Sequence, residues 1–185
     1  MHEEDRDLVR RWQYGDSAAF EGLVRRWQQP LARFLARLLG SAAPVADVCQ
    51  EVFLRVHLSR ERYRDEGNFS TWLYRIALNL ARDHIRKHAR LPIALREEVP
   101  LAARSDPPLW ERRELQEVMD EALGQLTPPL REVLVLRHYA EMNFETMARL
   151  LETPASTLKS RFAVALRQMQ AILQSLGYGE EEATP

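Results

Sequence analysis

The 185-residue sequence has little cysteine, little glycine and no long apolar run. Its single cysteine, Cys49, excludes an intramolecular disulfide framework and fits a reducing cytoplasm. Because no stretch of about 18 apolar residues occurs, we expect no transmembrane helix and no insertion into a membrane. Only seven glycines are present, and apolar residues do not alternate with polar ones over any long stretch. The composition therefore favours an all-α protein.

Arrangements that are typical of enzymes and metalloproteins are also missing from the sequence. There is no glycine-rich phosphate loop and no recognisable Ser/His/Asp set. His84 and His88 have the i, i+4 spacing of metal ligands, but cationic residues crowd the two histidines, and neither an HExxH motif nor a nearby pair of carboxylates completes a site. We therefore expect no catalytic residue, no metal and no cofactor.

The formal net charge of −1 is unusual for a DNA-binding protein, because such proteins usually carry a basic excess. The basic residues are, however, unevenly distributed. Five Lys or Arg and one acid lie between Trp72 and Leu91, and three Lys or Arg and no acid lie between Pro154 and Gln170. Two basic patches in a nearly neutral chain predict weak DNA binding alone and a larger partner that supplies more affinity.

Helical spacing of apolar residues predicts a helical bundle over 1–90. A first helix should end near Gly15, and Asp16 or Ser17 should cap the next one. We expect Pro30 to kink or restart this second helix before it ends at Gly40. The helix that follows buries Val48, Val52, Phe53 and Val56, so that Asp47, Gln50, Glu51 and Arg55 lie wholly or partly on its polar side.

The stretch 68–90 predicts one helix with two incompatible faces, capped by Ser70. At about 100° per residue, Arg75, Asn79, Arg82 and Arg86 lie within a stripe about 60° wide. Leu73, Ile76, Ala77 and Leu80 lie on the other side. Because Arg suits phosphate oxygens and Asn can read a base edge, this polar face is expected to contact DNA.

After Arg90 the periodicity stops, and four prolines predict an extended linker over 91–112. Helical periodicity then returns over 113–176, and 177–185 forms a short acidic tail. Within 143–169, Asn143 caps a short helix, Glu152, Thr153 and Pro154 break it, and a second helix begins at 155–157. This is the pattern of a helix-turn-helix, whose second helix reads bases and grips phosphate. Its outward residues include Ser156, Thr157, Lys159, Ser160, Arg161 and Arg167.

Three blocks, in this order, resemble the extracytoplasmic-function group of the bacterial sigma-70 family. DVCQEVFLRVH (47–57) resembles the helix that binds core RNA polymerase, and FSTWLYRIALNLARDHIRK (69–87) resembles the segment that melts and reads the minus-ten element. LTPPLREVLVLRHYAEMNFETMARLLETPASTLKSR (126–161) is similar to the domain that reads the minus-thirty-five element. The likeness implies a sigma factor, not an enzyme, that directs core polymerase to promoters and initiates transcription in the cytoplasm.

The resemblance also implies roles for individual residues. Core polymerase would be bound by Asp47, Gln50, Glu51 and Arg55. Minus-ten DNA would be bound by Tyr63, Asn68, Trp72, Tyr74, Arg75, Asn79, Arg82 and Arg86, with Asn79 capturing a flipped base and the loop 63–70 forming the wall of its pocket. Minus-thirty-five DNA would be bound by Ser156, Thr157, Lys159, Ser160, Arg161 and Arg167. Many members of the group are held inactive by an anti-sigma factor that covers the same faces.

The sequence departs from the family pattern in the helix-turn-helix. Glu152 occupies the turn position where the family usually has glycine, and Val164 and Leu166 stand where basic residues usually continue. We expect Leu166 on the core side and Val164 on the outward face. Two alternatives remain: a helix-turn-helix regulator that acts without polymerase, and a helical adaptor. The basic stripe over 75–86 argues against the first, and the two basic faces argue against the second.

Overall fold

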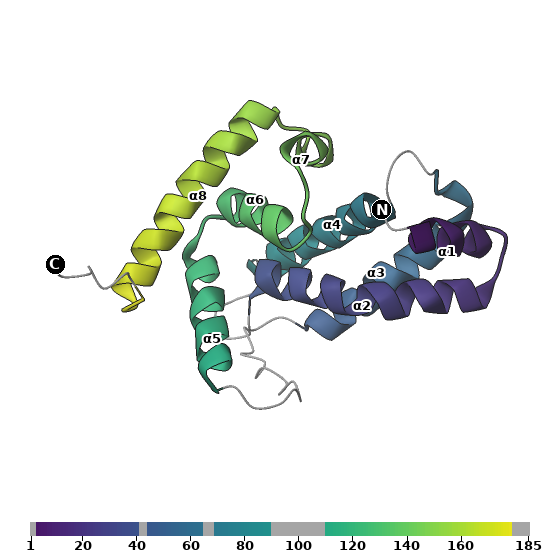
Figure 1. The fold of residues 1–185 in the computed structure, drawn as a ribbon, viewed down its shortest axis with the longest axis horizontal. Helices are drawn as coiled ribbons and strands as arrows, with labels where there is room; N and C mark the ends of the chain where they lie inside the picture. The colour runs from purple at the N-terminus through teal and green to yellow at the C-terminus, as the bar shows by residue number, and fades with distance from the viewer. Residues whose placement is uncertain (1–2, 41–43, 65–68, 90–109, 179–185) are drawn as a thin grey trace. The chain divides into compact units, whose positions relative to one another are not determined.

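The computed structural model describes residues 3–40, 44–64, 69–89 and 110–178, and every regular element in these ranges is a helix. The chain divides into two compact units, Met1–Val99 and Pro100–Pro185. The first unit contains α1 (Glu3–Gln13), α2 (Ser17–Leu39), α3 (Val45–Leu58), the short 3-10 helix η1 (Arg60–Arg62) and α4 (Phe69–Ala89). The second contains α5 (Trp110–Gln125), α6 (Pro128–His138), α7 (Phe144–Leu151) and α8 (Ala155–Ser175) (Figure 1). The predicted all-α class with two small helical domains is confirmed, and the predicted linker as far as residue 109 lies outside the described residues.

Trp12 lies at the centre of an aromatic core in the first unit. Its side chain is 1% exposed, and its ring centroid lies 5.9 Å from Phe20, 6.1 Å from Tyr63 and 6.3 Å from both Phe69 and Trp72. These rings come from α1, α2, the residue directly after η1 and the first turn of α4. Aromatic pairs at such distances add to the stability that burial provides. The cluster therefore holds α1 and α4 together around the start of the helix that carries the basic stripe.

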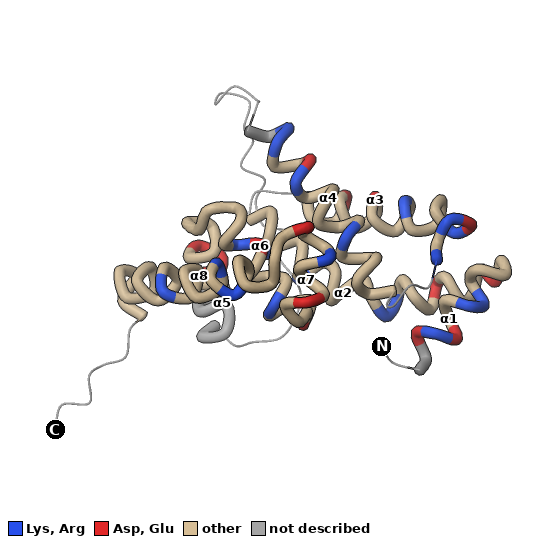
Figure 2. Tube along the Cα trace, turned by 90° about the horizontal axis from the view of Figure 1, so that it is seen from above, with Lys and Arg blue, Asp and Glu red and all other residues tan. Residues whose placement is uncertain are grey.

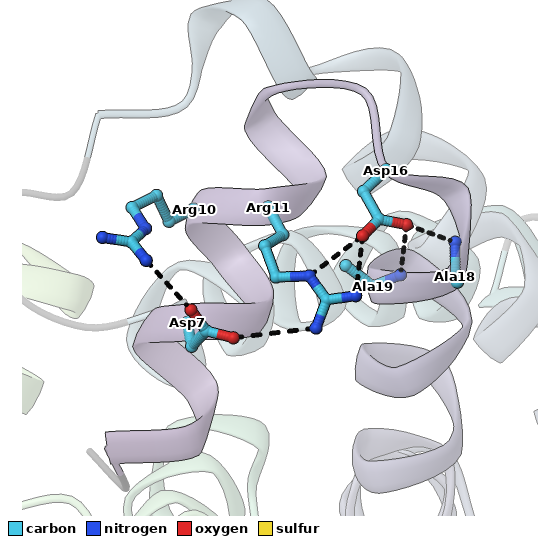
Figure 3. Close-up of polar contacts among 6 residues, drawn as sticks. All are labelled: Asp7, Arg10, Arg11, Asp16, Ala18 and Ala19. Carbon is cyan, nitrogen blue, oxygen red and sulfur yellow. Dashed lines mark hydrogen bonds and ion pairs between the residues drawn. The ribbon is translucent and has the colours of Figure 1, made fainter.

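The junction between α1 and α2 depends on Asp16 (Figure 3). Its Oδ1 accepts hydrogen bonds from the backbone N–H groups of Ala18 (2.9 Å) and Ala19 (3.2 Å), which caps α2 as the sequence predicts. Its Oδ2 accepts from Nε (2.9 Å) and Nη2 (2.7 Å) of Arg11 on α1. The hydrogen bond from Arg11, followed by that from Ala19, lowers the pKa of Asp16. One carboxylate thus ends the turn, begins α2 and fixes α1 beside it.

One predicted helix boundary in this unit is wrong, and of the two outcomes expected at Pro30, a kink or a restart, the restart does not occur. The helix α2 continues through Pro30 to Leu39 and ends at Gly40 with a positive φ of 81°. Proline costs α2 a backbone hydrogen bond, but Leu31, Phe34 and Leu35 beyond it are all fully buried, and that burial retains the helix. Ser70 does not precede α4, because the helix begins at Phe69, whose ring is fully buried against Trp12.

The second unit has an aliphatic core. Its fully buried side chains lie on α5, α6, α7 and α8, and they include Ala122, Val133, Leu136, Met147, Leu158 and Ala165. Thr127 precedes Pro128 at the start of α6 without a capping hydrogen bond from its side chain, whereas Asn143, as predicted, caps α7 by accepting a hydrogen bond from the N–H of Thr146 at 2.8 Å. Both α6 and α7 pack against α8.

The turn between α7 and α8 is tight, and it contains a residue that is unusual for its conformation. Glu152 ends α7 in the left-handed region, with φ 51° and ψ 40°. A side chain in this region costs of the order of 1 kcal/mol, which is why glycine is common there. The N–H of Thr153 returns to the carbonyl of Ala148 at 3.2 Å, so the turn closes although glycine is absent.

Candidate nucleic-acid interface

The polar stripe of α4 lies on the solvent side of the first unit. Arg75, Asn79, Arg82 and Arg86 are all exposed, and Figure 2 shows in blue the positions of Lys and Arg along α4. On the opposite side Leu73 and Ala77 are fully buried and Leu80 is 5% exposed. The predicted separation of α4 into a core face and a cationic face is therefore present in the structure.

The cations of this stripe are not equivalent. Arg86 is paired with Asp83, one turn before it on the same helix. Arg75 forms no ion pair with any residue in the described part of the chain. An exposed ion pair of the Arg86 type is weak in water, so a phosphate can replace Asp83 as its partner at little cost. The stripe thus offers one unengaged guanidinium near its start and one intramolecularly paired guanidinium near its end.

The aromatic residues that were expected to contact DNA are buried or half-buried, unlike the exposed residues of the stripe. Tyr63 and Tyr74 are each 3% exposed, so their burial does not fit the contact expected of them. Tyr74 packs against Phe34 on α2, with ring centroids 4.7 Å apart, because α4 is covered by both α2 and α3 and its buried arc is wider than one stripe. Trp72 is half-buried, with its ring 4.6 Å from that of Tyr63. Asn68 and most of the predicted pocket loop lie outside the described residues.

The predicted polymerase-binding residues share the exposed face of α3. Asp47, Gln50, Glu51 and Arg55 are all exposed, whereas the opposite face buries Val52 and Val56 completely. Arg55 donates a hydrogen bond to Glu51 at 2.6 Å, one turn before it. Hence Asp47 and Gln50 meet solvent directly, while Glu51 and Arg55 form a local ion pair that a partner would have to share or replace.

The α7–turn–α8 segment has the predicted helix-turn-helix form. Ser156, Thr157, Lys159 and Ser160 are exposed over the first turns of α8, and Arg167 is exposed two turns later. Arg161 is half-buried, so it is less accessible than predicted. The hydroxyl of Ser160 donates to the carbonyl of Ser156 at 3.1 Å, and its oxygen can still accept a hydrogen bond. The exposed side chains at the beginning of α8 are small or cationic, as entry into a DNA groove requires.

Two positions on α8 reverse the sequence prediction. Leu166 is 44% exposed rather than turned to the core, and Val164 is half-buried rather than fully outward. The buried line of α8 runs through Leu158, Ala165 and Met169. Leu166 lies about 80° from Leu158 around the helix axis, at the edge of the buried face, where a small offset decides exposure. The large apolar side chain that is exposed on α8 is therefore Leu166.

Arg137 is a candidate DNA contact that sequence reasoning missed. Its guanidinium carbon and the ammonium nitrogen of Lys159 each lie 5.9 Å from the centre of the Phe144 ring, at the start of α7. Arg137 is also held by a hydrogen bond to the carbonyl of Met142 at 3.3 Å. Both cations are exposed, and an aromatic ring favours cations beside its face. Arg137 lies in the last turn of α6, where a cation interacts favourably with the helix dipole. Its charge therefore has an explanation within the helix, and the sequence alone did not connect it with DNA.

Comparison with known proteins identifies the class to which these two units belong. Sequence models of that class match both units: Sigma-70 region 2 matches residues 23–91, and Sigma-70, region 4 matches residues 116–169. The RNA polymerase sigma-H factor of Pseudomonas aeruginosa is 30% identical, over 94% of this chain and 96% of that protein. The ECF RNA polymerase sigma-E factor of Haemophilus influenzae is 32% identical, over 93% and 96%. CnrH, solved in complex with the cytosolic domain of CnrY, is 26% identical with a TM-score of 0.72, over 94% of this chain and 99% of that one.

The fold and the order of the two matched regions define a transcription initiation factor. The chain belongs to the extracytoplasmic-function group of the sigma-70 family of RNA polymerase sigma factors. As a sigma factor, it directs core RNA polymerase to promoters, and the alternative of a regulator that acts without polymerase is not supported. Among the described residues, no helix is long and apolar enough to cross a membrane.

Proposed function

We propose that this sigma factor divides promoter recognition between its two units. The exposed first turns of α8 bind the duplex of the upstream element, with Lys159 and Arg167 at phosphates and Ser156, Thr157 and Ser160 towards base edges. Arg161, which is half-buried, contributes less. The observation that supports this assignment is the presence of two separate basic faces, on α4 and α8, in a chain whose net charge is −1.

The stripe on α4 receives the downstream element after its strands separate. Arg75, Arg82 and Arg86 hold the phosphates of one strand, and the carboxamide of Asn79, between them, reads the edge of a base turned out of the stack. A base must leave the duplex before a small pocket can read its hydrogen-bonding edge, and a row of cations along one helix keeps the strand in place meanwhile. Tyr63 and Tyr74 support the helix from within the core and are not part of this contact set.

The polar face of α3 binds core polymerase, through Asp47, Gln50, Glu51 and Arg55. The low net charge makes this step necessary, because nonspecific attraction to DNA grows with the number of phosphates a protein neutralises. The chain itself contributes no catalytic step, since phosphodiester chemistry belongs to the polymerase. Its place of action is then the cytoplasm, where the polymerase and the promoters are.

The same faces are open to inhibition by an anti-sigma factor. CnrH was solved with the cytosolic domain of another protein bound. An inhibitor of this kind would bind this chain on the exposed faces of α3 and α4, and it would prevent polymerase and DNA from binding. An inhibitor that left both faces accessible would contradict this part of the proposal.

Reconstitution with core RNA polymerase is the most direct test. Purified chain and core enzyme should co-elute on gel filtration, and the complex should transcribe a library of genomic fragments from start sites that core enzyme alone does not use. DNA binding by the free chain should be weak at physiological salt. If neither a complex nor a new start site appears, the proposed function is wrong.

A further inference from the structure

The exposed face of α3 is only half polar. Asp47, Glu51, Leu54 and Leu58 follow one another at i, i+4, i+7 and i+11, which places them along one line of the helix. All four are exposed, and the leucines are 57% and 73% exposed. The acidic residues occupy the first half of this line and the leucines occupy the second. We call these four residues the α3 stripe.

Leucines in this position are not needed by the fold. The core side of α3 buries Val48, Val52 and Val56 against its neighbours, and the α3 stripe lies on the opposite side of the helix. One exposed leucine is common in any soluble protein, but two of them one turn apart form a continuous apolar strip. Arg55, which could cover them with its stem, is instead held to Glu51 in the direction of the N-terminus. The strip is therefore open to a partner.

We propose that Leu54 and Leu58 are the apolar anchor of the surface that binds core RNA polymerase. This inference rests on the proposed docking role of the neighbouring Asp47 and Glu51, with which the leucines are continuous. It extends the docking face to the C-terminal end of α3 and changes its character from polar to amphipathic. The polymerase surface that fits must present cations opposite the two acids and an apolar groove opposite the two leucines.

The size of the strip favours a large, mixed partner surface. Two leucine side chains expose far less than the roughly 800 Å² that each partner buries in a stable protein interface. The leucines can therefore anchor a contact only if it continues over the acidic half of the α3 stripe. A few buried apolar residues provide most of the affinity of such interfaces, while exposed charges mainly steer association and fix the register.

The test uses the full-length chain with Leu54→Ala and Leu58→Ala combined. Affinity for core polymerase is measured by fluorescence anisotropy over a series of salt concentrations. We expect the double variant to bind at least about tenfold more weakly than the wild type, with an unchanged dependence on salt. The variant with Asp47→Asn and Glu51→Gln should instead show a shallower salt dependence, because it removes charges and keeps the leucines.

Folding is controlled in the same experiment. Alanine is a better helix former than leucine, and both sites are exposed, so the thermal midpoint of the double variant should match that of the wild type. Tyr14→Ala is the matched control: Tyr14 is 88% exposed and lies in the same unit, but it is not on the α3 stripe. Its removal should leave the affinity for polymerase unchanged.

The outcomes separate this inference from the proposed function. No binding of the wild type to core polymerase would refute the proposed function itself. Wild-type binding that the leucine variant retains, or that Tyr14→Ala weakens equally, would overturn the anchor and leave the sigma-factor assignment intact. A dimer of the free wild-type chain that the leucine variant dissolves would show that a second copy, not polymerase, covers the strip.

Discussion

The helices α4 and α8 each contain 21 residues, yet they present their polar side chains in different places. On α4 the cations and Asn79 lie along the middle turns, from Arg75 to Arg86. On α8 the proposed base-facing side chains lie in the first turns, from Ser156 to Ser160. A helix end can enter a groove of duplex DNA, whereas a row along a helix flank suits a strand that runs beside it.

The cores that support the two helices also differ, because one is aromatic and the other is aliphatic. The first unit packs the rings of Phe20 on α2, Tyr63, and Phe69 and Trp72 on α4 around Trp12, while the second packs aliphatic side chains around Leu158 and Ala165. Aromatic rings bury large areas with few rotatable bonds. The comparison indicates that the helix proposed to hold an opened strand is also the one with the more rigid support at its first turn.

The largest expected effect comes from removing the centre of the aromatic core. Trp12→Ala should lower the free energy of unfolding of the first unit by about 3–5 kcal/mol, because it leaves a cavity among four rings. Urea denaturation followed by amide NMR would measure each unit separately, and the signals of the second unit should keep their midpoint. An equal shift of both units would show that they are stabilised as one body. Tyr14→Ala, which removes an exposed ring, is the control.

Asn79→Ala tests the assignment of strand reading to α4. We expect open-complex formation, detected by permanganate reactivity of unpaired thymines, to fall about tenfold or more, since a bidentate contact to a base contributes about 1–3 kcal/mol. Affinity for core polymerase should not change. Equal loss of core binding would remove the proposed distinction between α4 and α3.

Lys159→Gln tests the assignment of duplex contacts to α8. With the reconstituted holoenzyme on a duplex that carries only the upstream element, affinity should fall severalfold and the salt slope should decrease by about 1. Arg82→Gln on α4 is the matched control, because a helix that acts on separated strands should not affect this duplex. If the salt slope changed in Arg82→Gln and not in Lys159→Gln, the upstream duplex would be bound by α4 and not by α8.

Glu152→Gly should stabilise the turn before α8. Glycine relieves the cost of a side chain at a φ of 51°, although it also loosens the unfolded chain, so we expect a gain of up to about 1 kcal/mol in the second unit. Glu152→Ala keeps the Cβ atom and should not produce this gain. Chemical denaturation measures both. A destabilised Glu152→Gly would mean that the glutamate side chain contributes more than its backbone strain costs.

The smallest effect is the pH dependence of the α1–α2 junction. The pKa of Asp16 is lowered in the folded chain, mainly by the hydrogen bond from Arg11. Its stabilising contribution is therefore complete above the ordinary pKa of an aspartate and is lost as pH falls through the lower folded value. The thermal midpoint of the wild type should fall more steeply on acidification below about pH 4 than that of Asp16→Asn, which retains a capping oxygen. Parallel curves would contradict this.

Local rules predicted most of the fold. Asp16 and Asn143 cap the helices that the sequence assigned to them, and apolar spacing placed the buried valines of α3 correctly. The same periodicity separated the exposed stripe of α4 from its core side. These features depend on neighbouring residues within one helix, so a single sequence contains enough information to find them.

The errors arise where several elements meet. Tyr74 is buried because α2 covers a side of α4 that one helical wheel leaves open, and Tyr63 is buried because rings from distant segments gather around it. Leu166 is exposed because the packing of α8 is offset by part of a turn. The helix α2 does not restart at Pro30, one of the two outcomes expected there, because the buried residues beyond it outweigh one lost hydrogen bond. Packing between helices, which periodicity does not describe, decides each of these cases.

The position of Trp12 also affects how the first unit should be cut for biophysical work. The sequence model of region 2 begins to match at residue 23, whereas the ring at the centre of the aromatic core belongs to α1, which ends at Gln13. A fragment that starts at the family boundary would lack that ring together with Asp16, and it would begin within α2 without a cap. Such a fragment should expose Phe69 and Trp72 and aggregate, whereas one that starts at the first residue of α1 should remain monomeric.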